Sequence, residues 1–253
     1  METIFIGTGS GKTSLSRHHS SFLIKTKNHS LLIDSGDGVS RALLSQGVDA
    51  RKIDSILLTH YHSDHFSGLP ALITQMKLLE RESELNIYTH TSLIAPLKIF
   101  LHNTYIFPGI LKFNINIVGF EFGAVCPIDS QLNFTTRQNS HISNKHNLIY
   151  SDVSFVSGSV LVTTEGKNLF YTSDIGSEDD LYLFREKQID FFISETTHIP
   201  IEKIYQAFIK SGAKSLYLTH IDEKDEELLK VWYRKLNQPK NIYLTYDGLT
   251  IKS

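Results

Sequence analysis

The sequence predicts an α/β fold in which polar residues gather at the carboxyl ends of buried strands. Short apolar runs, which are typical of buried strands, alternate along the chain with stretches of helical periodicity. Three such runs, residues 53–59, 168–172 and 216–219, lead within two residues into a histidine or an aspartate. Because an open α/β sheet carries its chemistry beyond the carboxyl ends of its strands, these steps predict a functional site.

Composition limits the class of protein. The 253 residues suit one large domain, 1–253, better than two. We expect no secretory leader, since the start lacks a basic segment followed by a long apolar core, and no window reaches the length of a membrane span. Cys126 is the single cysteine, which excludes an internal disulfide and favours the cytoplasm. The net charge of -2 argues against a protein that coats nucleic acid.

The strongest motif is the run His-Tyr-His-Ser-Asp-His at residues 60–65, directly after a predicted strand and before a predicted helix. His60 and His62 alternate, so in an extended backbone both rings point the same way. Asp64 and His65 follow on the connecting loop and can address a second point nearby. Imidazoles and a carboxylate at this density predict a site for two first-row metal ions.

The glycine-rich residues 7–13 admit a different interpretation. A phosphate-binding P-loop needs the pattern G-x-x-x-x-G-K-[ST] and a helix directly after it, because the helix N-terminus helps to hold the phosphates. Gly11, Lys12 and Thr13 fit the end of this pattern, but Ile6 stands where its first glycine belongs. Residues 14–20 also lack a convincing amphipathic pattern, so a nucleotide triphosphatase is disfavoured.

Further elements complete the alternation. We expect strands over 2–6, 22–24, 31–33, 85–89, 132–136, 160–164, 189–194 and 242–244, and helices over 39–46, 69–81, 92–102, 201–211 and 226–236. The segment 91–119 admits several interpretations, because the apolar stretch around Tyr105 and Phe107 is broken by Pro108 and Gly109. It fits core, a lid over the site or a dimer surface, and the sequence favours core.

The H-x-H-x-D-H motif resembles that of the metallo-β-lactamase superfamily, and the chain resembles its ribonuclease Z-like phosphodiesterase branch from end to end. The opening strand, the Gly-Thr-Gly-Ser-Gly turn at 7–11, Arg17 and the Asp-Ser-Gly-Asp-Gly run at 34–38 match the opening of those relatives. The resemblance implies an αββα sandwich of the metallo-β-lactamase type, with two mixed β-sheets flanked by helices. It also implies that Asp34 orients the histidine loop without binding metal.

The resemblance further implies seven metal ligands: His60, His62 and His141 for one ion, Asp64, His65 and His220 for the other, and Asp174 between them. His141 follows its strand most directly, and His146 is the alternative at this position. Zn²⁺ is expected first and Mn²⁺ second, and a hydroxide shared by the ions would attack the phosphate.

A phosphodiester leaving group needs a proton, and His198 is the candidate general acid. In ribonuclease Z relatives a histidine at the matching place, just before a helix, has this role, and Glu195 would orient its ring. The match is partial, because Ile199 and Pro200 replace the Ser-Thr of those relatives. The pairing of Asp64, which we also count as catalytic, with His198 favours phosphodiester hydrolysis over β-lactam or thioester hydrolysis.

Three functions remain open at this point. The first is a phosphodiesterase for a small nucleotide, most of all a cyclic nucleotide. Long ribonuclease Z proteins grip tRNA with an arm formed by a long Gly-Pro-rich insertion, and this chain has no such insertion. A tRNA 3′-end processing endonuclease is the alternative, and the acidic run 222–227 counts against it. A non-catalytic or nucleotide-binding protein would leave all the metal motifs unused. Relatives of this branch commonly form homodimers, and we expect one here.

Overall fold

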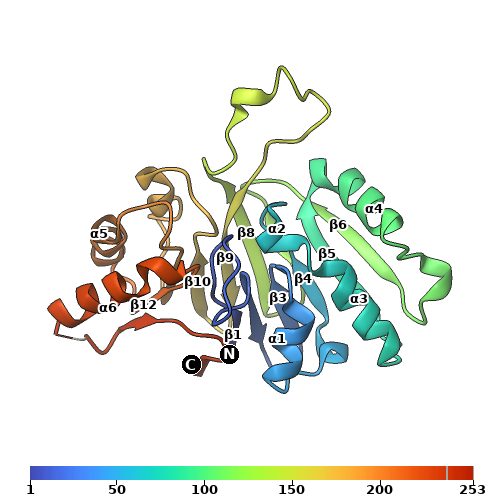
Figure 1. The fold of residues 1–253 in the computed structure, drawn as a ribbon, viewed down its shortest axis with the longest axis horizontal. Coiled ribbons are helices and arrows are strands. Elements are labelled where there is room, and N and C mark those ends of the chain that lie inside the picture. The colour runs from blue at the N-terminus through green and yellow to red at the C-terminus, as the bar shows by residue number, and fades with distance from the viewer. Residues whose placement is uncertain (238, 253) are drawn as a thin grey trace. The chain divides into compact units, whose positions relative to one another are not determined.

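The computed structural model describes residues 1–237 and 239–252, apart from the side chain of His146. The chain forms two compact units: unit 1 comprises Met1–Glu121 with Asp247–Ser253, and unit 2 comprises Phe122–Tyr246. Within the described residues, each unit is built on one mixed seven-stranded sheet with flanking helices (Figure 1). The prediction of two mixed sheets with helices is confirmed, and the single domain 1–253 stays a prediction.

The sheet of unit 1 has the strand order β14-β1-β2-β3-β4-β5-β6. Its strands are β1 Glu2–Gly7, β2 Ser21–Lys25, β3 Ser30–Ile33, β4 Ser55–Leu57, β5 Leu85–His90, β6 Ile115–Phe120 and β14 Thr250–Lys252. Pairing is antiparallel from β14 to β3 and parallel from β3 to β6. The carboxyl ends of β3 and β4 therefore meet at one edge, where Asp34 and His60 follow them.

Helices pack on this sheet through one apolar core. They are α1 Val39–Ser45, the single turn α2 Ser63–Phe66, α3 Leu69–Leu78 and α4 Ile94–Asn103, with the 3₁₀ turns η1 Ala50–Lys52, η2 Thr91–Leu93 and η3 Pro108–Ile110. Leu43 of α1, Ile73 of α3 and Leu97 of α4 lie fully or almost fully buried against strand residues such as Ile56. Burial of these stripes fixes the helices that border the histidine motif.

The sheet of unit 2 has the order β13-β12-β11-β10-β9-β8-β7. Its strands are β7 Val125–Pro127, β8 Leu132–Gln138, β9 Gly158–Thr164, β10 Lys167–Tyr171, β11 Phe191–Ser194, β12 Ser215–Leu218 and β13 Ile242–Leu244. The strands β10 to β13 run parallel, and β7 to β10 are antiparallel. Asp174, Glu195 and His220 follow β10, β11 and β12, so they emerge at one edge of this sheet.

Two helices flank this second sheet: α5 Ile201–Ser211 and α6 Glu226–Lys235. The described residues of unit 2 also contain the 3₁₀ turns η4 Asn144–His146, η5 Glu178–Tyr182 and η6 Glu223–Asp225. Helix α5 buries Ile204, Ala207 and Phe208, as its periodicity predicts, and ends at Gly212 in the left-handed conformation. Between β8 and β9 the chain forms a long loop that projects away from these strands (Figure 1).

Two expectations for unit 1 can be compared with the fold. Residues 8–38, all of which the structure describes, contain no helix, so the helix that a P-loop requires after Thr13 is absent. In segment 91–119, α4 contributes Leu97 and Leu101 to the core, whereas Tyr105 is 76% exposed. The core interpretation therefore holds for α4 and is wrong for Tyr105. No helix among the described residues is long and apolar enough to cross a membrane.

Candidate metal centre

The histidine motif of unit 1 begins where β4 ends. His60, Asp64 and His65 are buried, and His62 is exposed. The His60 ring centre lies 4.8 Å from that of His62 and 4.2 Å from that of His65. Asp64 and His65 do not lie on an open loop as expected. The His62 carbonyl accepts hydrogen bonds from His65 and Phe66 N–H, which closes the helical turn α2 and turns both side chains inward.

Asp34 holds this motif in place through hydrogen bonds. Its carboxylate is fully buried and accepts hydrogen bonds from the Thr59 N–H (2.9 Å) and hydroxyl (3.0 Å). Its second oxygen lies 2.7 Å from His65 Nδ1. Burial raises the pKa of the Asp34 carboxyl, and the neighbouring His65 and Thr59 oppose that rise. With Nδ1 occupied by Asp34, His65 Nε2 is the nitrogen that suits a metal, a typical arrangement for a metal-binding histidine.

Glycines allow the surrounding loops to approach the motif closely. A Cβ on Gly36 would lie 2.1 Å from the Asp64 carbonyl oxygen, and one on Gly68 would lie 2.1 Å from the Gly36 carbonyl oxygen. A Cβ on Gly11 would lie 3.2 Å from Asp64 Oδ2, so the first glycine loop borders this carboxylate. The backbone positions of Asp64 and His65 therefore depend on the absence of side chains at these places.

The first glycine loop is itself held by the end of the chain. Asp247 accepts hydrogen bonds from the Thr8 N–H (2.9 Å), the Thr8 hydroxyl (2.7 Å) and the His18 N–H (2.7 Å). Arg17 donates to the Thr8 hydroxyl at 2.6 Å. Contacts of this kind between chain ends leave no local pattern in the sequence. These contacts give the loop a role in supporting unit 1.

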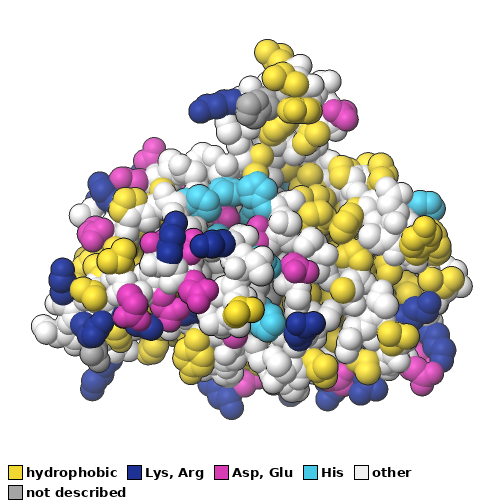
Figure 2. Space-filling view, viewed as in Figure 1, with side chains coloured by type: hydrophobic (Ala, Val, Ile, Leu, Met, Phe, Trp, Pro, Cys, Tyr) yellow, Lys and Arg dark blue, Asp and Glu magenta, His cyan; other side chains and the backbone are white. Residues whose placement is uncertain are grey.

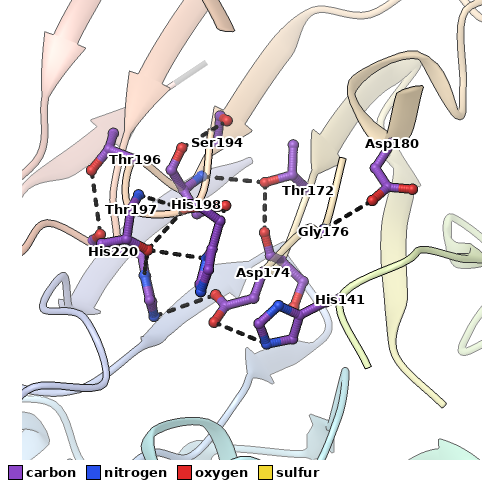
Figure 3. A network of polar contacts seen from close by, with 12 residues as sticks. His141, Thr172, Asp174, Gly176, Asp180, Ser194, Thr196, Thr197, His198 and His220 are labelled. Atoms are coloured by element: carbon purple, nitrogen blue, oxygen red, sulfur yellow. Dashed lines mark hydrogen bonds and ion pairs between the residues drawn. The ribbon is translucent and has the colours of Figure 1, made fainter. Parts of the chain in front are cut away.

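In unit 2, Asp174 lies between two histidines (Figure 3). Its Oδ2 is 3.6 Å from His141 Nε2, and its Oδ1 is 3.3 Å from His220 Nε2. Two ligand atoms bound to one tetrahedral zinc ion at its usual bond lengths lie roughly 3.4 Å apart. These spacings, and the 3.5 Å between His65 Nε2 and Asp64 Oδ2 in unit 1, therefore fit pairs of metal ligands. Because each Asp174 oxygen pairs with a different histidine, this carboxylate is suited to serve two ions.

Asp180 joins the loops that carry His141 and Asp174. It is buried and accepts hydrogen bonds from Ser140 N–H and hydroxyl on one side and from Ser177 N–H on the other. It also accepts a hydrogen bond from Gly176 N–H (Figure 3). A Cβ on Gly176 would lie 2.3 Å from the Ser140 carbonyl oxygen, so these loops touch. The sequence analysis missed Asp180. Its signal was the Ser-x-x-Asp pattern of 177–180, which forms a capping box at η5.

Glu195 and His198 form a second polar group in unit 2. Glu195 is fully buried and accepts hydrogen bonds from the backbone N–H of Thr197 (2.6 Å) and of His198 (3.0 Å). Its Oε1 lies 3.1 Å from His198 Nδ1. The His198 side chain is 39% exposed, and its ring centre is 4.8 Å from that of His141. A buried, fully bonded carboxylate thus orients an accessible imidazole beside one of the candidate ligands.

The predicted residues fall into one group in each unit. Unit 1 brings together His60, His62, Asp64 and His65, and unit 2 brings together His141, Asp174, Glu195, His198 and His220. Apart from His198, the histidines and aspartates among them belong to clusters typical of dinuclear metal sites. The side chain of His146, the alternative to His141, lies outside the part of the chain that the structure describes.

Comparison with known proteins decides the family. The family model "Anti-Pycsar protein Apyc1" matches residues 1–230. The chain belongs to this family. Members of the Apyc1 family degrade cyclic nucleotides, and they are metal-dependent hydrolases of the metallo-β-lactamase fold. Both the expected superfamily and the expected class of enzyme are thereby confirmed.

Individual relatives agree with this assignment. Ribonuclease Z of Pyrococcus furiosus is 28% identical over 264 residues, which cover 87% of this chain and 86% of the relative. Ribonuclease Z of Pyrococcus abyssi is 39% identical over 109 residues, and this match spans 43% of the chain and only 36% of the relative. The chain therefore spans about a third of that ribonuclease Z in this match.

Solved structures show the same fold. The Bacillus subtilis protein YhfI, of metallo-β-lactamase fold, has a TM-score of 0.77 and 20% identity, with 99% of this chain and 98% of that chain covered. Human tRNase Z, short form (ELAC1), has a TM-score of 0.74 and 19% identity, with 100% of this chain and 99% of that chain covered. These similarities confirm the metallo-β-lactamase fold of the Apyc1 family member described here.

Proposed function

We propose that this chain is a dinuclear metal-dependent phosphodiesterase that hydrolyses a cyclic nucleotide. The observation that carries the proposal is the Asp174 carboxylate, whose two oxygens pair with different histidines in a chain of a family that degrades cyclic nucleotides. In this proposal residues 1–253 act as one catalytic domain. One ion would be held by His60, His62 and His141, the other by Asp64, His65 and His220, with Asp174 serving both.

Imidazole-rich ligands favour Zn²⁺, with Mn²⁺ as the second choice. When bound, two such ions supply a water of lowered pKa and offset the charge on the phosphoryl oxygens. The protein's share is to hold the ligands in place. Asp34 fixes the His65 ring, and Asp180 ties together the loops that carry His141 and Asp174. Such supporting contacts are worth roughly 10- to 100-fold in metal affinity.

The proton for the leaving group would come from His198. When the P–O ester bond breaks, the departing ribose oxygen carries the electron pair and must gain a proton. Glu195 accepts the Nδ1–H of His198, which leaves Nε2 as the nitrogen that hands over the proton. Because Glu195 is buried and also holds the backbone N–H of Thr197 and His198, the imidazole keeps a fixed direction.

A tRNA 3′-end processing endonuclease is the second candidate, favoured by the similarity to Pyrococcus furiosus ribonuclease Z over 87% of the chain. Against it stand Asp222, Glu223 and Asp225, which follow His220 and place negative charge where tRNA phosphates would need positive charge. The loop between β8 and β9 does not supply a Gly-Pro-rich arm, since residues 139–157 contain neither glycine nor proline.

Turnover by purified, metal-loaded protein separates the two candidates. A panel of 3′,5′-cyclic mononucleotides is compared with a 3′-extended tRNA precursor, and Asp64→Ala serves as the metal-ligand control. The proposal predicts hydrolysis of at least one cyclic mononucleotide that disappears in the control. Cleavage of the tRNA precursor alone would establish the endonuclease instead.

We also propose that the protein acts in the cytoplasm as a homodimer. Support for a dimer comes from the loop between β8 and β9, on which hydrophobic side chains gather (Figure 2). Leu148 is 94% exposed, Ile149 71% and Tyr150 55%. Apolar groups exposed together often mark an interaction surface. Light scattering coupled to size-exclusion chromatography should show a dimer for the wild type and a monomer for Leu148→Asp with Ile149→Asp; a wild-type monomer would contradict the proposal.

A further inference from the structure

A cavity of about 620 Å³ opens beside His198 within unit 2. One wall is formed by residues 196–202, which run from the Glu195–His198 pair into the start of α5. The other wall is formed by α6 and the residue before it: Asp225, Leu228, Leu229, Val231, Trp232 and Lys235. A volume of this size lies within the usual range for sites that bind small molecules.

Helix α6 presents an unusual face to this cavity. Val231, Trp232 and Lys235 follow Leu228 by three, four and seven residues, so all four share one side of the helix. Leu228 is 68% exposed and Val231 is 42% exposed, although both are apolar. Leu229 is the buried residue that anchors this helix. The packing of α6 on its own unit therefore does not explain why Leu228 and Val231 line the cavity.

Trp232 offers the cavity an aromatic surface. Tyr205 of α5 meets its ring edge to face, at 5.8 Å between centres and 78° between planes. This contact fixes the indole, which is only partly buried. Glu202 and Asp225 supply hydrogen-bond acceptors to the lining, and Lys235 supplies a donor. An apolar slot with one aromatic face and a few polar groups suits a flat heterocycle with polar edges.

We propose that this cavity is the nucleobase subsite of the phosphodiesterase and that Trp232 stacks on the base. His198 belongs both to the acid–base pair and to the cavity wall, and Thr197 of the same wall donates its N–H to Glu195. The oxygen that His198 would protonate belongs to the ribose, and the ribose carries the base. A substrate placed with its leaving oxygen at His198 therefore has its base within the cavity. The subsite rests on the proposed function.

The chain contains one tryptophan, so tryptophan emission, excited at a wavelength where the 11 tyrosines absorb little, reports on this cavity alone. Adenosine 5′-monophosphate and cytidine 5′-monophosphate are titrated into the metal-loaded protein, and ribose 5-phosphate, which has no base, is the control. Saturable quenching of tryptophan emission by the nucleotides but not by ribose 5-phosphate is expected. Two outcomes would overturn the subsite. One is unchanged tryptophan emission at concentrations where equilibrium dialysis shows bound nucleotide, and the other is no nucleotide binding at all.

Kinetics separate a base contact from a merely structural role. Trp232→Ala should raise KM for 3′,5′-cyclic AMP roughly 5- to 150-fold, the usual range for loss of one stacked base. It should leave KM unchanged for a methyl riboside 3′,5′-cyclic phosphate, which lacks the base, and Trp232→Phe should restore most of the affinity. Ile209→Ala, an exposed site on α5 outside the cavity, is the matched control and should behave as wild type. An equal rise in KM for both substrates would exclude a base contact.

The two proposals fail in different ways. Saturable, base-dependent quenching without turnover of any cyclic nucleotide would leave the subsite standing and remove the proposed activity. Turnover of a cyclic nucleotide with normal KM in Trp232→Ala and no quenching would leave the activity standing and remove the subsite.

Discussion

Replacing Gly36 by alanine should weaken metal binding by displacing the histidine motif. The added Cβ would lie 2.1 Å from the Asp64 carbonyl oxygen and 2.7 Å from the His19 Cβ. Since real Cβ contacts do not fall below 3.0 Å, the Asp64 carbonyl must move away by at least 0.9 Å. Flexible side chains cannot absorb this shift, because the obstacle is backbone. The same turn is held by Ser35 N–H, which donates to the His65 carbonyl at 2.6 Å.

A displacement of that size matters because metal–ligand distances tolerate only about 0.2 Å. Asp64 and His65 would leave the positions in which their ligand atoms lie 3.5 Å apart. We expect a fall in affinity for Zn²⁺ on the order of 10- to 100-fold. Competition against a fluorescent zinc chelator measures this value, and circular dichroism verifies that the variant is folded.

Gly109→Ala is the matched control, because a Cβ at Gly109 would meet no atom within 4 Å. It should bind Zn²⁺ as the wild type does. Wild-type affinity in a folded Gly36→Ala protein would refute the idea that this close backbone contact positions the motif.

Three further results are expected. His198→Ala should lower kcat on a cyclic nucleotide roughly 10²- to 10⁴-fold. It should change the hydrolysis of bis(p-nitrophenyl) phosphate little, because nitrophenolate leaves without a proton. Equal losses of kcat on both substrates would contradict the role of His198 as an acid. Asp180→Ala should lower the free energy of unfolding in urea by about 1–3 kcal/mol, because it removes the charged acceptor of the part-buried hydrogen bonds from Ser140 and Gly176 N–H, whereas the exposed Asp179→Ala should not. Burial of Asp190 opposes its ionisation, but hydrogen bonds, foremost from Lys214, outweigh burial and lower its pKa. The contribution of ionised Asp190 to stability is thus present above about pH 4 and lost as pH falls through the lowered pKa. Asp190→Asn should therefore lose less stability on acidification than the wild type, as measured by circular dichroism. An unchanged pH profile of unfolding would contradict this.

Local sequence patterns predicted the strand ends that the candidate metal ligands follow. The buried strand before His60 and the one before His220 were visible because apolar runs stop abruptly at a histidine, and the structure has β4 and β12 there. Helix α5 was predicted over 201–211 and forms over Ile201–Ser211, since three apolar residues at helical spacing and a terminal glycine agree. In these segments the local sequence and the tertiary environment favour the same conformation.

Elements defined by distant partners were not predicted. Strand β14 pairs with β1 at the opposite end of the chain, so neither segment reveals the other through periodicity. Strand β6 was missed because Ile115–Phe120 are mostly half-buried and show no alternation. The role of Asp180 depends on hydrogen bonds to Ser140, which lies 40 positions away. Contacts of this kind become visible only when the chain is folded.

The measurement that tests the central claim most directly is a metal titration of catalysis. Protein stripped by a chelator is titrated with Zn²⁺, and in parallel with Mn²⁺, while hydrolysis of a 3′,5′-cyclic mononucleotide to the linear monophosphate is followed by chromatography. We predict no turnover without metal and an increase that levels off at two ions per chain. Turnover that persists in the stripped protein, or a fully metal-loaded protein that hydrolyses no cyclic mononucleotide, would contradict the account.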